Sequence, residues 1–290
     1  MTPQGLLKIC ENKASLWHLG LRNLRNRPGT AHLLPTRAAP QPARERALTD
    51  SHLDPCPDLL PTGAMIRRSF LILTLLAGCG RPLTEAEVAF VGTIQGAALD
   101  TDRVRLIDGA PTRAVTFRRK ARPRTTCREL ILPPPEEAIV TAKPAAVTLW
   151  SRVLFDRDWY LDDYVPDYPD EINLIAAMLL THEMTHVWQW QNRKVTGYSP
   201  LRAAREQQRS DDPYLFEIAG DRRFSAFGYE QQASIIEEFT CCRALAPQAP
   251  RTKRLHALIA QAMPVAPLPA ARQYDVRLPW DGVELDGICG

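Results

Sequence analysis

The chain has 290 residues, a length that fits one large domain or two modest ones. Its 36 basic and 33 acidic side chains give a formal net charge of +3, which is too small to indicate a nucleic-acid partner. An apolar fraction of 45% argues against wholesale disorder, and seven cysteines are too few for a disulfide-dense miniprotein.

The N-terminal part of the chain differs in composition from the rest. Residues 27–61 contain seven prolines and show no apolar face with helical or strand periodicity. This composition is typical of a disordered segment. The first 64 residues therefore contribute no predicted element to a folded domain.

Residues 65–79 have the order of features found in an export signal. Arg67 and Arg68 precede a short apolar core at 70–76, which is too short to span a bilayer. The segment ends in Leu-Ala-Gly-Cys, which resembles a bacterial lipobox, the site at which a cysteine is acylated and becomes the new N-terminus. The resemblance implies a signal peptide at 65–78 and lipidation of Cys79.

A signal peptide should begin its chain, and this one begins 64 residues in. We therefore expect Met65 to be the initiator and residues 1–64 to be a wrongly assigned or disordered extension. The processed protein would be residues 79–290, whose 212 residues fit a single domain. These residues include 26 basic and 28 acidic side chains, so the net charge of the mature part is −2. The expected location is the cell envelope, on the periplasmic side and on the outer membrane, with the lipid as anchor.

The predicted elements of the mature part are short strands followed by longer helices. Thr84 and Glu87 have the spacing of a helix-capping box and predict a helix that ends near Gln95. Apolar patterning predicts strands at about 102–108, 113–117, 129–132 and 145–149. Unbroken stretches predict helices at about 171–193, 201–208, 229–245 and 252–262. This order indicates an α+β fold with a small, mostly antiparallel N-terminal sheet.

Four cysteines of the mature part remain besides the lipid site: Cys127, Cys241, Cys242 and Cys289. In an oxidising periplasm they could form two disulfides. Because vicinal cysteines rarely pair with each other, we favour one of the vicinal pair bonding Cys127 and the other bonding Cys289. Free buried thiols are the alternative.

The long helix predicted from residue 171 contains His182-Glu-Met-Thr-His186. The two histidines lie one helical turn apart on the same face, so both imidazoles can bind one metal ion. Glu183 is adjacent to the first ligand and can act as general base toward a water at the metal. This HExxH pattern predicts a zinc site with Glu183 as the catalytic residue. Two histidines satisfied by core hydrogen bonds are the alternative.

A zinc site of this kind needs a third protein ligand. The metzincin extension is absent, because Gln189 and Asn192 occupy its Gly and His positions. The remaining candidates come from downstream of the first helix: Glu230, Glu217 and His256. Glu237 and Glu238 are expected to be charges on the surface of a helix.

Glu230 is favoured by a resemblance. Residues 229–234 resemble the ExxAD ligand helix of several membrane-associated zinc peptidases, which implies that Glu230 is a ligand and that small Ala233 lets this helix approach the first. Ser234 departs from that pattern, in which an Asp supports a ligand histidine. Ser234 itself, Glu237 or a backbone group could take over that contact.

The wider motif set extends the resemblance. Residues 181–190 with the 229–236 segment are similar to the metallopeptidase domain attached to extracellular contractile-injection proteins, and most similar to small bacterial Vgr-related proteins. The resemblance spans roughly residues 83–245. It implies a gluzincin-type zinc fold, a helical zincin-like subdomain and a possible partner in a secretion system.

Two functions of different class fit these residues. The first is a lipid-anchored zinc metallohydrolase, most directly a peptidase acting on a peptide or protein substrate. The second is a non-catalytic scaffold lipoprotein of the envelope or of a secretion system, in which the metal joins two helices. An amidase acting on cell-wall peptide is a third, weaker possibility. Candidates for stabilising an oxyanion are Tyr198, Tyr214, Tyr229 and His256.

Overall fold

The computed structural model describes residues 80–118, 124–134, 139–210 and 212–290. The predicted extension, the signal peptide and the lipidation site Cys79 lie outside these residues. Within the described part of the chain, no helix combines the length and the apolar character needed to cross a membrane.

The helices of the described residues largely match the prediction. The capping box of Thr84 and Glu87 is present and starts the first of them. Their bounds are α4 Glu85–Gln95, α5 Cys127–Ile131, α6 Leu174–Gln191, α7 Arg193–Thr196, α8 Pro200–Arg209, α9 Tyr229–Leu245 and α10 Pro250–Ile259.

The strands of the described residues are short and form three small sheets. Their bounds are β1 Arg105–Asp108, β2 Val115–Arg118, β3 Ile139–Ala142, β4 Ala146–Leu149, β5 Arg152–Phe155, β6 Glu171–Asn173 and β7 Asp275–Arg277. The strand order in the first sheet is β1-β5-β4, while β2 pairs with β3 and β6 pairs with β7. Helices and separate small sheets together make a mixed fold consistent with the α+β class.

One prediction about the strands was wrong. The segment 129–132 belongs to the helix α5, because Thr126 and Glu129 form a second capping box that starts a helical turn there. Among the described residues, most pairings of the N-terminal strands are antiparallel, as predicted: β4–β5 and β2–β3 are antiparallel, and β1 is parallel to β5. The later strands β6 and β7 pair in parallel. The partner of β6 comes from residues 275–277, about a hundred residues later in the chain, and local patterning does not reveal such a partner.

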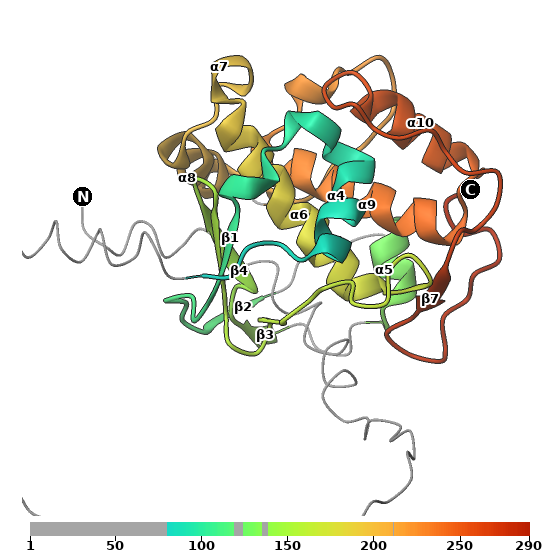
Figure 1. Ribbon diagram of the computed structural model, residues 1–290, viewed down its shortest axis with the longest axis horizontal. Helices are drawn as coiled ribbons and strands as arrows, with labels where there is room; N and C mark the ends of the chain where they lie inside the picture. Colours follow the sequence, from blue (N-terminus) through green and yellow to red (C-terminus); the bar gives the residue numbers. More distant parts are fainter. Residues whose placement is uncertain (1–79, 119–123, 135–138, 211) are drawn as a thin grey trace, which may run out of the picture. The chain divides into compact units, whose positions relative to one another are not determined.

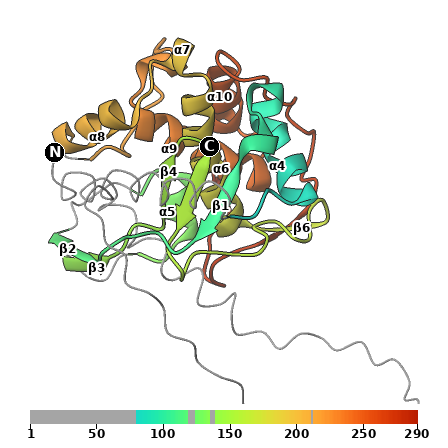
Figure 2. The same cartoon turned by 60° about the vertical axis from the view of Figure 1, so that its left-hand side comes forward.

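Helices α6 and α9 form the centre of the fold and lie side by side (Figure 1). Every residue of α6 from Leu174 to Gln189 is buried, and every residue of α9 from Gln232 to Leu245 is buried. A helix that is covered on all sides does not need an amphipathic stripe. The HExxH motif therefore lies in the buried part of α6, with the sheet that contains β4 on one side of it (Figure 2).

Two disulfides connect α9 to distant segments. Cys127 on α5 bonds to Cys241, and Cys242 bonds to Cys289 near the C-terminus. The favoured pairing is confirmed. Consecutive residues of a helix point in directions about 100° apart, so the vicinal cysteines reach two different neighbours.

Candidate metal centre

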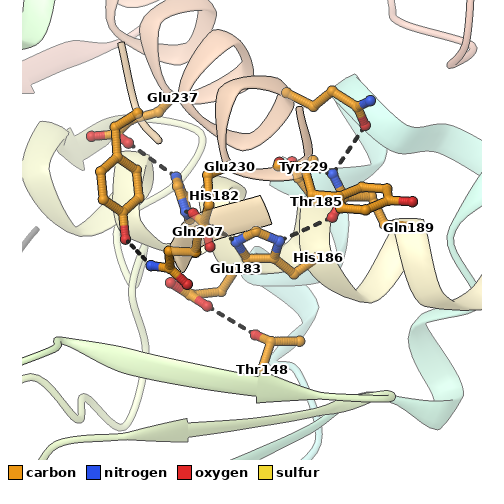
Figure 3. A network of polar contacts seen from close by, with 12 residues as sticks. Thr148, His182, Glu183, Thr185, His186, Gln189, Gln207, Tyr229, Glu230 and Glu237 are labelled. Atoms are coloured by element: carbon orange, nitrogen blue, oxygen red, sulfur yellow. Dashed lines mark hydrogen bonds and ion pairs between the residues drawn. The ribbon is translucent and has the colours of Figure 1, made fainter. Parts of the chain in front are cut away.

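Helices α6 and α9 bring three potential ligand atoms together. His182 Nε2 and His186 Nε2 are 3.2 Å apart, and each lies 3.4 Å from Oε2 of Glu230 (Figure 3). All three residues are buried or nearly so. The structure thus groups the three residues that the sequence predicts as ligands.

The spacing of these atoms can be compared with that of a zinc site. Tetrahedral ligands placed about 2.0–2.1 Å from a zinc ion are separated from one another by about 3.3–3.4 Å. The observed separations of 3.2, 3.4 and 3.4 Å match the edges of such a tetrahedron. Two imidazole nitrogens and one carboxylate oxygen are also a donor set that zinc accepts in proteins.

Each histidine is oriented by a hydrogen bond at its other ring nitrogen. His182 Nδ1 lies 3.1 Å from Oε2 of Glu237, and His186 Nδ1 lies 3.0 Å from Oε1 of Gln189. The Gln189 amide nitrogen donates to the Tyr229 carbonyl and to Gln232, so its oxygen faces the imidazole as an acceptor. A carboxylate and an amide oxygen both require the Nδ1–H tautomer, which leaves Nε2 of both rings available to a metal.

His186 and Glu230 shift each other's pKa. Burial disfavours the charged imidazole of His186, but the charge and hydrogen bond of Glu230 outweigh burial and raise the pKa of His186 to about 9. Burial likewise favours a neutral Glu230, but the charge of His186 and the contacts with the two imidazoles hold the pKa of Glu230 far below its usual range. An imidazolium–carboxylate pair therefore occupies the position where the ligand atoms meet.

Glu183 lies in the same cleft as the three ligand residues. Its Oε2 accepts a hydrogen bond of 2.8 Å from the hydroxyl of Thr148 on β4 (Figure 3). The cleft is also lined by residues 144–149 and by Tyr198, Ala203 and Tyr214. The structure thus places the predicted general base beside the ligand cluster, in a cleft bordered by a β-strand.

The other third-ligand candidates lie elsewhere. Glu217 is exposed, and Nε2 of His256 bonds to the carbonyl of Ala266 at 3.0 Å. The expectation that Glu237 and Glu238 are surface charges was wrong, because both are buried. Each has a buried or partly buried partner, which offsets the cost of removing its charge from water.

Of the two side chains considered as support for a ligand histidine, Glu237 takes that position. The Ser234 hydroxyl is buried and has no hydrogen-bond partner among the described residues. Glu237 lies almost one turn further along α9, and its longer side chain reaches His182. The Asp-to-Ser departure at residue 234 is thus compensated three residues later.

The candidate oxyanion donors separate into two groups. Tyr198 and Tyr214 line the cleft, whereas the Tyr229 hydroxyl points to the Thr196 carbonyl at 3.4 Å and His256 lies outside the cleft. The sequence did not indicate that Thr148 and Gln189 belong to the site. A strand threonine and a helix glutamine are too common to single out without the tertiary contact.

No family model matches the chain, and no curated protein matches it. Among solved structures, the chain is similar to the effector domain of Pseudomonas aeruginosa VgrG2b, with 20% identity and a TM-score of 0.42 over 69% of this chain and 95% of that one. This neighbour is distant, and the chemistry of the site rests on the residues described above.

Proposed function

We propose that this protein is a zinc-dependent hydrolase that cleaves peptide bonds. The observation that carries the proposal is the convergence of His182 Nε2, His186 Nε2 and Glu230 Oε2 at tetrahedral separations, with the Glu183 carboxylate in the same cleft. Zinc held by these three residues supplies Lewis acidity to the scissile carbonyl and lowers the pKa of a water.

The remaining chemistry belongs to the side chains. Glu183 removes a proton from the attacking water and donates it to the leaving amine. The hydroxyl of Thr148 donates to Oε2 of that carboxylate at 2.8 Å and orients it. Tyr198 and Tyr214 line the cleft and are the candidates for stabilising the oxyanion.

The position of β4 beside the cleft supports a peptide substrate. In the described part of the chain, β4 is the end strand of the sheet β1-β5-β4 and pairs only with β5. Residues 144–149, which include this strand, line the cleft beside Glu183. A strand at the end of a sheet can pair main-chain groups with an extended peptide, and this would hold the scissile bond next to the ligand cluster.

We also propose that the protein is exported and lipid-anchored at Cys79, with the domain facing the periplasm. Support comes from the signal-like order of residues 65–79 and from the two buried disulfides, which persist in oxidising compartments. Metabolic labelling with palmitate should mark the wild-type protein and leave the Cys79→Ser variant unlabelled. Labelling of both proteins, or of neither, would contradict this assignment.

The function is tested with full-length protein and a library of internally quenched peptides. The Glu183→Gln variant should retain about one zinc per chain and lose peptide hydrolysis, whereas Glu230→Gln should lose both. Glu217→Gln removes an exposed carboxylate and should behave as wild type. A wild-type protein that binds zinc and cleaves no peptide would instead support the scaffold alternative, in which the metal only joins α6 to α9.

A further inference from the structure

The outer support of the ligand His182 continues beyond Glu237. Arg128, on α5, donates from Nη1 to Oε1 of Glu237 at 3.1 Å, while Oε2 of the same carboxylate faces Nδ1 of His182, also at 3.1 Å. The side chains are 9%, 1% and 1% exposed, in the order Arg128, Glu237, His182. A buried chain of three side chains therefore runs from α5 to the ligand cluster.

The position of Arg128 depends on tertiary contacts. A helix of five residues is far too short to be stable by itself, so α5 is held by its neighbours. Its first residue, Cys127, bonds covalently to Cys241 on α9, and the Cys127 backbone N–H donates to Oε1 of Glu238 at 3.0 Å. The residue directly after this anchor is Arg128.

We propose that Arg128 is a positioning residue of the metal centre and that the Cys127–Cys241 disulfide is the anchor that holds it there. The guanidinium engages one oxygen of Glu237 and so fixes the other oxygen on Nδ1 of His182. This sets the ring plane of His182 and keeps its Nε2 directed at the ligand cluster. Outer contacts of this type typically change metal affinity ten- to hundredfold.

The second disulfide is a natural control. Cys242–Cys289 also starts from α9 and is also buried, but it leads to the C-terminal segment and not to α5. Removing either bond deletes one covalent link to the same helix. Only removal of Cys127–Cys241 should release Arg128.

The inference rests on the proposed zinc site and does not depend on catalysis. Full-length variants are titrated with zinc against a chromophoric chelator, and unfolding temperatures are measured in parallel. Arg128→Met and the Cys127→Ser/Cys241→Ser pair should raise the zinc Kd ten- to hundredfold. Arg128→Lys should lie between these and wild type, and Cys242→Ser/Cys289→Ser should stay within about threefold of wild type. Equal weakening by both disulfide pairs, or no weakening by Arg128→Met, would overturn the proposal.

A second readout does not need bound metal. Proteins labelled with ¹⁵N-histidine report the ring tautomer, and the His182 signals are identified by their loss in His182→Ala. Metal-free wild type should show His182 with its proton on Nδ1, and Arg128→Met should show a mixture of tautomers. If Arg128→Met fails to fold, the tautomer and the zinc Kd are measured in Arg128→Met/Glu237→Gln, which removes both buried charges. An unchanged tautomer and unchanged Kd in that folded variant would refute the role of Arg128. If the wild-type protein binds zinc but cleaves no peptide, the proposed peptidase activity is refuted and the positioning role of Arg128 is not.

Discussion

The hydroxyl of Thr148 donates to Oε2 of Glu183 across 2.8 Å and joins the edge strand β4 to the HExxH helix. The bond orients the carboxylate that serves as general base in the proposed reaction. A hydrogen bond to a charged group contributes about 1.5–3 kcal/mol. Its loss should therefore affect turnover more than zinc binding.

Replacing Thr148 by Val keeps the side-chain shape and removes the donor. We expect kcat to fall at least about tenfold with zinc content unchanged, since 1.4 kcal/mol corresponds to a factor of ten. Steady-state kinetics on a peptide substrate measure the effect. Thr148→Ser should keep most of the activity. Thr116→Val, at an exposed position of β2, should leave kcat unchanged. An unchanged kcat in Thr148→Val would refute the orienting role.

Zinc removal should lower the stability of the protein. A ligand present at a thousand times its Kd stabilises the folded state by about 4 kcal/mol, which for a domain of this size is a shift in Tm of roughly 8–16 °C. Differential scanning calorimetry with added zinc and then with a chelator measures the shift. Glu230→Gln should show little shift, and Glu217→Gln should match wild type. A similar shift in Glu230→Gln would mean that zinc binds elsewhere.

Zinc binding should depend on pH through the proton on His186. Because its pKa is raised to about 9 in the metal-free protein, zinc must displace this proton at pH 7. The apparent Kd should rise about tenfold for each pH unit below 9 and level off above it, and calorimetry in two buffers should detect about one proton released at pH 7. A Kd that does not change between pH 7 and 9 would contradict the imidazolium–carboxylate pair.

The pair of His186 and Glu230 should also make the stability of the metal-free protein depend on pH, with stability falling as the pH rises. A raised folded pKa for His186 means that its stabilisation is fully present below the ordinary value of 6.5 and is lost as the pH rises through about 9. The Tm of chelator-treated wild type should therefore fall between pH 7 and 10 by more than the Tm of chelator-treated His186→Ala. Parallel pH profiles would show that the pair does not stabilise the fold.

Ala233 should be intolerant of a larger side chain. It is fully buried on α9, one turn beyond Glu230, in the region where α9 packs along α6. Ala233→Leu should lower the free energy of unfolding by about 1–3 kcal/mol through overpacking. It should also weaken zinc binding by separating Glu230 from the histidines. Ala257→Leu, at an exposed position of α10, is the control and should change neither quantity. Unaltered zinc affinity in a destabilised Ala233→Leu would contradict the dependence on helix spacing.

Local signals in the sequence were sufficient for the longer helices and for part of the site. The spacing of His182, Glu183 and His186 places them together on one helix wherever that helix lies, since helical geometry is local. The capping box at Thr84 and the absence of Pro and Gly through α6 likewise involve neighbours in the sequence. The vicinal cysteines limited the disulfide pairing because their own geometry disfavours a bond between them.

Only the tertiary structure decided which residues meet from distant parts of the chain. The pairing of β1 with β5 and of β6 with β7 joins segments far apart in the sequence. The contacts Thr148–Glu183, His182–Glu237 and Arg128–Glu237 likewise join residues that are 35, 55 and 109 positions apart. The residues next to a position in the sequence do not specify such a partner, because contacts at this range depend on how the whole core packs. The burial of Glu237 could not be predicted for the same reason. A carboxylate on a helix is usually exposed, and the burial of this one is stabilised by the ion pair with Arg128 on α5.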